Sequence, residues 1–207
     1  MGFLTRTAMT DQVEAILTRT DLTTQVKLRL DWAYEDVADS KEWQVLLIED
    51  KTTALVTSQQ DYALPTELRT AKYMTLVDDT GSSKVFTSMT AEDIGEWFDR
   101  SRNLTEDTGQ PKIYTLVGNK IRTFPIPSAT ENTFKLYIVG HKKVSYFSGD
   151  SSITDLDQKL DRAIIYRAAQ FCYDDLLEES EEALRYKNKA DEAVDNAFAD
   201  ELAYSAL

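Results

Sequence analysis

The sequence is poor in the residues from which most catalytic, metal and phosphate sites are built. It holds one cysteine, Cys172, and one histidine, His141. A single thiol excludes an internal disulfide framework and fits a protein made in a reducing cytosol. The loop from Asp79 to Lys84 lacks the second glycine and the Gly-Lys-Ser/Thr ending that a phosphate-binding loop requires.

Positive charge and long apolar runs are scarce as well. The chain has 36 Asp and Glu residues against 23 Lys and Arg, which gives a net charge of -13. This balance argues against a nucleic-acid groove, although an acidic protein can surround DNA that must pass without sticking. No stretch approaches the roughly 20 apolar residues of a membrane span. The first residues lack a signal-peptide core, and Arg6 stands where a myristoylation motif requires Ser or Thr.

What is present indicates one folded domain over residues 1–207. Hydrophobic residues make up 42% of the chain and there are ten tyrosines, which excludes wholesale disorder. The pattern predicts an α+β fold with a mainly helical core, formed by N-terminal helices in 10–40 and a long C-terminal helix in 155–207. An antiparallel β-subdomain is inserted at 51–147, with a short helix near 90–100.

Two helices are predicted at the N-terminus. Thr10 or Asp11 can cap the first, which ends near Thr20. The second begins at Asp21, and Asp31 is expected on its polar side. Its apolar residues recur at helical spacing, with two tryptophans extending the stripe: Leu22, Val26, Leu30, Ala33, Val37, Trp32 and Trp43.

The inserted region reads as short strands joined by turns. Gly118-Asn119 separates two β-rich runs and predicts a two-residue hairpin, after which Pro125 and Pro127 end the second strand. Residues 109–140 together read as a β-meander. Thr90 is expected to precede a short one-sided helix, and 99–110 reads as an exposed polar loop. Further strands are predicted at 52–57, 62–65, 72–77 and 84–88.

The C-terminal quarter is helical in pattern. No Gly or Pro interrupts residues 155–207. One continuous helix would be roughly 80 Å long, so it either bends near Ser180 or projects onto another subunit. The segment holds 14 acidic and 6 basic residues, so 14 minus 6 leaves it eight charges negative. This acidic surface is either a solvated helix face or a wall beside a polyanion.

No residue is predicted as catalytic, cofactor-binding or metal-binding. His141 ends a strand and is expected in a surface or turn position. Cys172 falls in the most apolar helix, where a buried inert thiol is expected. The acidic run from Asp174 to Glu182 lacks the Glu-x-x-His pairs of a di-metal helical site. A soluble hydrolase that uses two carboxylates remains an alternative, because such pairs are assembled in space.

Several short stretches, in order, resemble the head-to-tail adaptor (connector) proteins of tailed bacteriophages over residues 10 to 200. They are Gln59 to Pro65, Gly109-Gln110-Pro111 before Tyr114, the Gly118-Asn119 turn, Ile121 leading to Pro125-Ile126-Pro127, Phe134 to Tyr137, and the closing acidic, alanine-bearing helix. The resemblance implies a virion structural protein with no catalytic residues and no cofactor. It implies a dodecameric ring below the portal protein, made in the host cytoplasm and placed in the virion neck, through which DNA passes without specific binding.

Contact surfaces follow as expectations from this resemblance. The long C-terminal helix is expected to dock on the portal protein, because apolar residues persist to its end: Phe198, Leu202, Tyr204 and Leu207. The tail or nozzle protein, or the next subunit, is expected to meet a second set: Arg102, Asn103, Tyr114, Asn119, Tyr146 and Phe147. Another neck or tail-completion protein is the alternative nearest to this interpretation.

Overall fold

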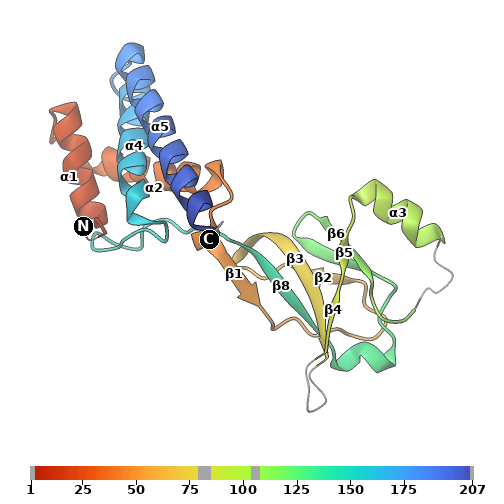
Figure 1. The fold of residues 1–207 in the computed structure, drawn as a ribbon. Helices are drawn as coiled ribbons and strands as arrows, with labels where there is room; N and C mark the ends of the chain where they lie inside the picture. Colours follow the sequence, from red (N-terminus) through yellow and green to blue (C-terminus); the bar gives the residue numbers. More distant parts are fainter. Residues whose placement is uncertain (1–2, 79–84, 104–107, 206–207) are drawn as a thin grey trace. The chain divides into compact units, whose positions relative to one another are not determined.

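The fold is α+β, as the sequence predicts, and it divides into two compact units. The computed structural model describes residues 3–78, 85–103 and 108–205 (Figure 1). The helical unit comprises Met1–Leu46 and Val144–Leu207, and the β unit comprises Leu47–Lys143. The sequence places the inserted region at 51–147, whereas the β unit begins at Leu47 and ends at Lys143, so residues 144–147 belong to the helical unit.

Four helices build the helical unit. They are α1 (Arg6–Leu17), α2 (Thr23–Ser40), α4 (Asp161–Asp175) and α5 (Ser180–Ser205), with short 3₁₀ turns η1 (Gln44–Leu46) and η3 (Gln158–Leu160). α4 packs against α1, α2 and α5, and its buried residues occupy most of its circumference. Figure 1 shows α1, α4 and α5 side by side. The apolar residues of α4 are therefore buried on several sides of the helix.

The first helix begins earlier than predicted. Thr5 is its N-cap and accepts a hydrogen bond from the Ala8 amide, so the prediction that Thr10 or Asp11 caps it was wrong. Thr10 lies inside the helix and donates to the Arg6 carbonyl at 2.8 Å. Within a helix, a threonine hydroxyl can donate a hydrogen bond to the carbonyl four residues earlier. A threonine near the start of a helical pattern therefore does not by itself mark the N-cap.

The apolar stripe of α2 is confirmed, with two corrections. Val26, Leu30, Ala33 and Val37 are fully buried, as is Trp43 after the helix. Trp32 was wrongly added to this stripe: it is 40% exposed. Asp31 was expected on the polar side but is 9% exposed, because it pairs with Arg6 at 2.7 Å inside the unit.

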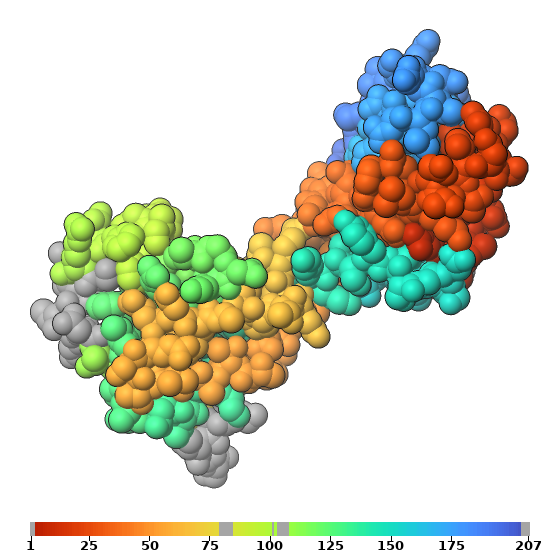
Figure 2. Space-filling view, turned by 180° about the vertical axis from the view of Figure 1, so that it is seen from behind, coloured from red at the N-terminus to blue at the C-terminus, as the bar shows by residue number. Residues whose placement is uncertain are grey.

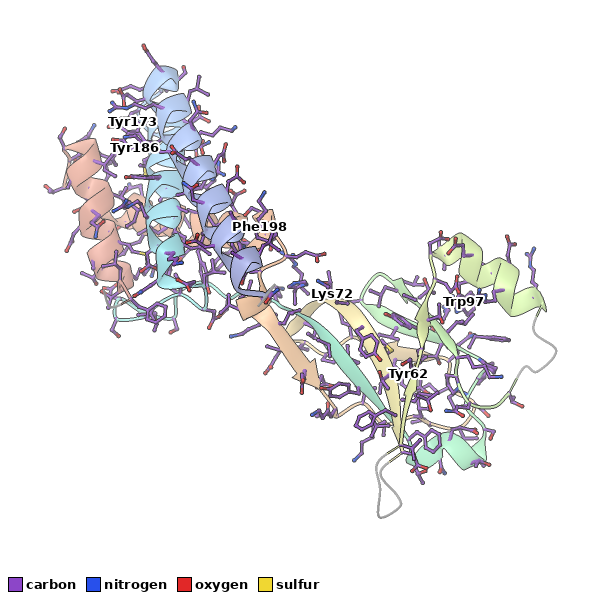
Figure 3. All side chains as sticks on the ribbon, in the orientation of Figure 1. Tyr62, Lys72, Trp97, Tyr173, Tyr186 and Phe198 are labelled. Carbon is purple, nitrogen blue, oxygen red and sulfur yellow. The ribbon has the colours of Figure 1, made fainter. Side chains whose placement is uncertain are left out.

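The C-terminal region bends near Ser180, one of the two outcomes that the sequence left open. α4 ends at Asp175, Glu178 adopts a left-handed φ of 54°, and α5 begins at Ser180. A single long helix is therefore replaced by a hairpin of two. Tyr173 and Tyr186 stack across it with ring centroids 5.5 Å apart (Figure 3), and the fully buried Ala190 lets the helices approach closely.

Two four-stranded sheets form the β unit. The first has the order β1 (Leu47–Asp50), β8 (Lys135–Lys142), β3 (Leu68–Asp78) and β4 (Val85–Ser88). The second has the order β2 (Asp61–Ala63), β7 (Lys120–Phe124), β6 (Ile113–Val117) and β5 (Thr90–Ala91). All pairs are antiparallel except β5 with β6, which is parallel. The expected purely antiparallel subdomain thus has one exception.

The predicted meander over 109–140 was wrong, although its hairpin is confirmed. β6 and β7 pair with Val117 opposite Lys120, and Gly118 supplies the positive φ of the two-residue turn. β8, however, belongs to the other sheet. Pro125 ends β7, and the 3₁₀ turn η2 (Ala129–Thr133) redirects the chain before β8 begins.

Other elements of the β unit were predicted with mixed success. The strands predicted at 72–77 and 84–88 are confirmed as β3 and β4, which pair with each other, while residues 79–84 between them lie outside the described residues. The strand at 52–57 was wrong: only Ala54 forms an isolated bridge there, and β1 was missed. Thr90 begins a short strand instead of capping a helix. α3 (Ile94–Asn103) is capped by Asp93, whose carboxylate accepts a hydrogen bond from the Glu96 amide. Residues 99–103, which were expected in an exposed loop, belong to this helix.

Candidate functional site

The C-terminal end of α5 is held against its own helical unit. The Phe198 ring meets Trp43 edge to face, with centroids 5.6 Å apart, and Lys41 lies 5.4 Å above it (Figure 3). Glu201 accepts hydrogen bonds from the amides of Gln44 and Val45 at 2.9 and 3.3 Å. The last turns of α5 therefore hold η1 in place, which apolar periodicity alone could not show.

The residues predicted for portal contact differ in their surroundings. Phe198 is half-buried by these contacts, whereas Leu202 one turn later is 50% exposed. The backbone of Tyr204 is helical, but its side chain and all of Leu207 lie outside the described residues. Leu202 is thus the residue of this set that the structure places on the surface.

The second predicted set is divided between surface and core. Arg102 on α3 and Asn119 in the β6–β7 turn are exposed. Tyr114 is 3% exposed and belongs to the core of the β unit. Asn103 is the last residue of α3, and its side chain lies outside the part of the chain that the structure describes. Because Tyr114 fills its own core, we leave it out of any contact surface.

Tyr146 and Phe147, in the helical unit, also separate. Tyr146 is 55% exposed and donates a hydrogen bond to Glu35 of α2 at 3.1 Å. Phe147 is 8% exposed and packs against Tyr34 with centroids 5.3 Å apart. Of these adjacent aromatics, one is a core residue and the other extends the outer surface of α2.

That outer surface of α2 was not predicted. We call it the α2 face, and it consists of exposed residues at helical spacing together with Tyr146: Leu28, Trp32, Glu35, Asp36 and Asp39. The Arg29 guanidinium lies 4.2 Å above the Trp32 ring. The spacing of 28, 32, 35 and 39 was visible in the sequence, but Trp32 had been assigned to the buried stripe.

A groove of about 700 Å³ lies between the chain before α1, the start of α4 and the second half of α5. We call it the α1/α4/α5 groove. Its apolar lining includes Leu4, Ile165, Ala193 and Ala197. Cationic side chains lie along it: Arg162 is exposed, Lys189 is 4.5 Å from the Tyr186 ring and 5.5 Å from the Tyr166 ring, and Lys159 pairs with Asp200 at 2.8 Å.

The candidate reactive residues are buried. His141 is 4% exposed within β8, opposite Leu47, so its expected surface or turn position was wrong. Cys172 is fully buried in α4, as predicted, and burial raises the pKa of its thiol to about 12. Among residues 3–78, 85–103 and 108–205, no group of three or more His, Cys, Asp and Glu side chains could hold a metal ion. The acidic run at 174–182 thus gathers no ligand set in the described structure.

Comparison with known proteins gives the decisive observation. A family model described as SU10 adaptor protein matches residues 5–206, which is nearly the whole chain. The chain belongs to the SU10 adaptor protein family. It is therefore a bacteriophage head-to-tail adaptor, a virion component of tail assembly, and the family predicted from the ordered sequence stretches is confirmed.

No curated protein matches this adaptor. None of the helices that the structure describes has the length and apolar content of a membrane span.

Proposed function

We propose that the adaptor assembles as a ring between the portal protein and the tail, and that it acts without catalysis. The match of residues 5–206 to a head-to-tail adaptor family is the observation that carries this proposal. Both ends of such a ring contact other proteins, and DNA passes through its lumen. The resemblance in sequence implies twelve copies.

Portal docking is assigned to the end of α5. Leu202 is an exposed apolar residue in the last turns of this helix, directly after Phe198 and Glu201, whose contacts fix those turns. A helix that is already anchored by its own unit loses little conformational freedom when it binds a groove on a partner. The exposed positions Arg102 and Asn119 of the β unit are proposed to face the tail protein.

The lumen is proposed to be acidic. The net charge of -13 gives each copy an excess of carboxylates, so a ring of copies repels a DNA backbone unless basic residues line its channel. Repulsion of this kind lets DNA move through the ring without specific binding. A lumen lined by basic or neutral side chains in an image of the assembled neck would contradict this.

The ring is tested by mixing the adaptor with the portal protein of its phage and measuring the mass of the complexes. We expect a discrete complex that contains many adaptor copies, and a closed ring in electron micrographs. An adaptor that stays monomeric beside intact portal rings would overturn the proposed function.

The docking site is tested by point substitution, because removing residues after Asp195 would also remove Phe198 and Glu201 from the fold. Leu202→Asp is expected to weaken portal binding roughly tenfold or more, as loss of an apolar anchor does at an interface. Leu184→Asp is the matched control, since Leu184 is 58% exposed at the other end of α5. Equal binding by the two variants would rule out docking through the end of α5.

A further inference from the structure

We propose that the α2 face of one adaptor copy inserts into the α1/α4/α5 groove of the next copy, and that this contact closes the ring. The inference rests on the proposed ring and names the two surfaces that would form it. Both surfaces belong to the helical unit.

The two surfaces lie on different sides of α4. Arg162 and Tyr166, one helical turn apart, line the groove. Arg167 instead pairs with Asp36 of α2 at 2.9 Å. Figure 1 draws α2 behind α4, and Figure 2, seen from behind, shows the red and orange atoms of α1 and α2 in front. A ring of identical copies requires two different, mutually complementary surfaces per chain, and these positions supply them.

The α2 face has the composition of a protein interface. Leu28, Trp32 and Tyr146 are 45%, 40% and 55% exposed. The guanidinium of Arg29 lies over Trp32, which holds the indole in one orientation before any partner arrives. Trp, Tyr and Arg are the residue types in which binding free energy is concentrated at interfaces. Three large exposed side chains around one helix therefore indicate a contact surface.

The groove lining holds three basic side chains, Lys159, Arg162 and Lys189, and three acidic ones, Asp161, Glu192 and Asp200. Lys159 pairs with Asp200 and Asp161 is buried, so the remaining charges of the groove are those of Arg162, Lys189 and Glu192. Within the described helical unit, Arg162 and Lys189 have no carboxylate at ion-pair distance, and both line the groove. Each of the other Lys and Arg side chains of that unit pairs with a carboxylate at 3.2 Å or less. The α2 face carries Glu35, Asp36 and Asp39.

This charge arrangement favours a second copy as the occupant. Copies that each carry a net charge of -13 repel one another, so association needs a local site of attraction. Arg162 and Lys189 outnumber the one remaining carboxylate of the groove, that of Glu192, and so provide such a site for the carboxylates of α2. Electrostatic complementarity of this kind also fixes the register between neighbours.

Shape is compatible with the same occupant. The groove is lined with small apolar residues on α5, Ala193 and Ala197, which allow another helix to approach closely. Its volume of about 700 Å³ accommodates several inserted side chains. Leu28 and Trp32 are one turn apart on α2, so both can enter the groove from a single helix.

Cross-linking between two differently tagged chains tests the contact. One chain carries Leu28→Cys and the other Asn196→Cys, a groove-lining position on the exposed side of α5. The chains are mixed, assembled into rings on the portal protein, and treated with a short bismaleimide. The buried Cys172 does not react. We expect cross-links between the two chain types, and none when Leu184→Cys replaces Asn196→Cys.

Charge reversal provides a second readout. Arg162→Glu with Lys189→Glu is expected to weaken subunit association roughly tenfold or more, as removal of interfacial charge pairs does. Glu35→Lys with Asp39→Lys, added to the same chain, should restore association. Arg185→Glu with Lys187→Glu is the matched control, because these exposed side chains of α5 do not line the groove.

The outcomes separate this inference from the proposed function. If rings form but positions 28 and 196 of neighbouring chains do not cross-link, the pairing of these two surfaces is wrong, while the proposed ring still stands. A cross-link from position 196 to the portal protein also overturns it, because the portal would then occupy the groove. If no ring forms under any condition, the proposed function fails and the inference falls with it.

Discussion

At the scale of single residues, Asp161 ties the start of the chain to the start of α4. Its carboxylate is 4% exposed and accepts hydrogen bonds from the Leu4 amide at 2.9 Å and from the Thr154 hydroxyl at 3.4 Å. Burial raises the pKa of this carboxyl group, although the Leu4 amide favours its charged form. Leu4 lines the α1/α4/α5 groove, so Asp161 also positions one wall of that surface.

This raised pKa has a consequence for stability. Between the unfolded and folded pKa values the native state binds more protons, so the contribution of Asp161 to the free energy of unfolding falls as pH rises through the folded pKa. Asp161→Asn cannot ionise, and its amide oxygen can still accept from the Leu4 amide. Its NH2 group would donate to the Thr154 hydroxyl, which can itself donate to the Leu156 carbonyl. We expect its stability relative to the unsubstituted adaptor to be more favourable at pH 7 than near the ordinary carboxyl pKa. Denaturant unfolding followed by helical circular dichroism at both pH values measures this.

Two results complete the Asp161 experiment. Asp161→Ala should lower the free energy of unfolding by about 1–3 kcal/mol, because the partly buried Leu4 amide then loses its acceptor. The difference in unfolding free energy between Asp161→Asn and the unsubstituted chain could instead be the same at both pH values. That result would show that folding does not raise the pKa of Asp161.

At the scale of elements, the pairing of β3 with β8 depends on a glycine. The register between the strands shifts twice, between Leu68 and Thr70 and between Ala71 and Tyr73. These irregularities bring the Thr70 carbonyl against Gly140, where an added Cβ would lie 2.0 Å from the oxygen. Only a residue without a side chain allows this approach of two backbones.

Gly140→Ala should therefore destabilise the β unit. We expect a loss of about 2–4 kcal/mol, because the obstructing atoms are backbone and the strands must separate to relieve the overlap. The matched control is Gly149→Ala, since nothing lies within 4 Å of a Cβ added there. Thermal unfolding of both variants measures the effect. Equal melting temperatures would show that the strands can shift at no cost.

At the scale of the whole molecule, the β unit is an insertion whose two ends lie together. Leu47, its first residue, pairs with His141 of β8, two residues before the unit ends at Lys143. Each unit also has its own cluster of buried apolar residues. Adjacent ends and separate cores are the features that let an inserted unit be removed without unfolding its host.

We expect each unit to fold alone. A chain in which a short Gly-Ser linker replaces residues 47–143 should keep the helical circular dichroism and cooperative unfolding of the helical unit. Residues 47–143 by themselves should give a folded β protein. Loss of cooperative unfolding in the helical chain would show that its stability depends on the inserted sheets.

The two pieces also separate the proposed contacts. If the α2 face and the α1/α4/α5 groove close the ring, the helical chain retains the groove and should still associate with itself and with the portal protein. The isolated β unit should do neither, because both surfaces and the end of α5 belong to the other unit.

The sequence determined by itself those elements whose signals are local. The buried stripe of α2, the Gly118-Asn119 hairpin and the burial of Cys172 all follow from spacing or turn chemistry within a few residues. The family followed from the order of many weak local patterns, and the match over residues 5–206 confirmed it.

Tertiary structure alone decided which residues form core and which form surface. Tyr114 and Phe147 look like Tyr146 in the sequence, yet only Tyr146 is exposed, and Trp32 faces outward beside a buried stripe. Likewise, β8 joined a different sheet from the hairpin that precedes it. Propensity and spacing act over a few residues, whereas burial depends on contacts between segments far apart in the chain. For this reason the sequence supplied the elements and the family, and the packing of helices and sheets supplied the surfaces.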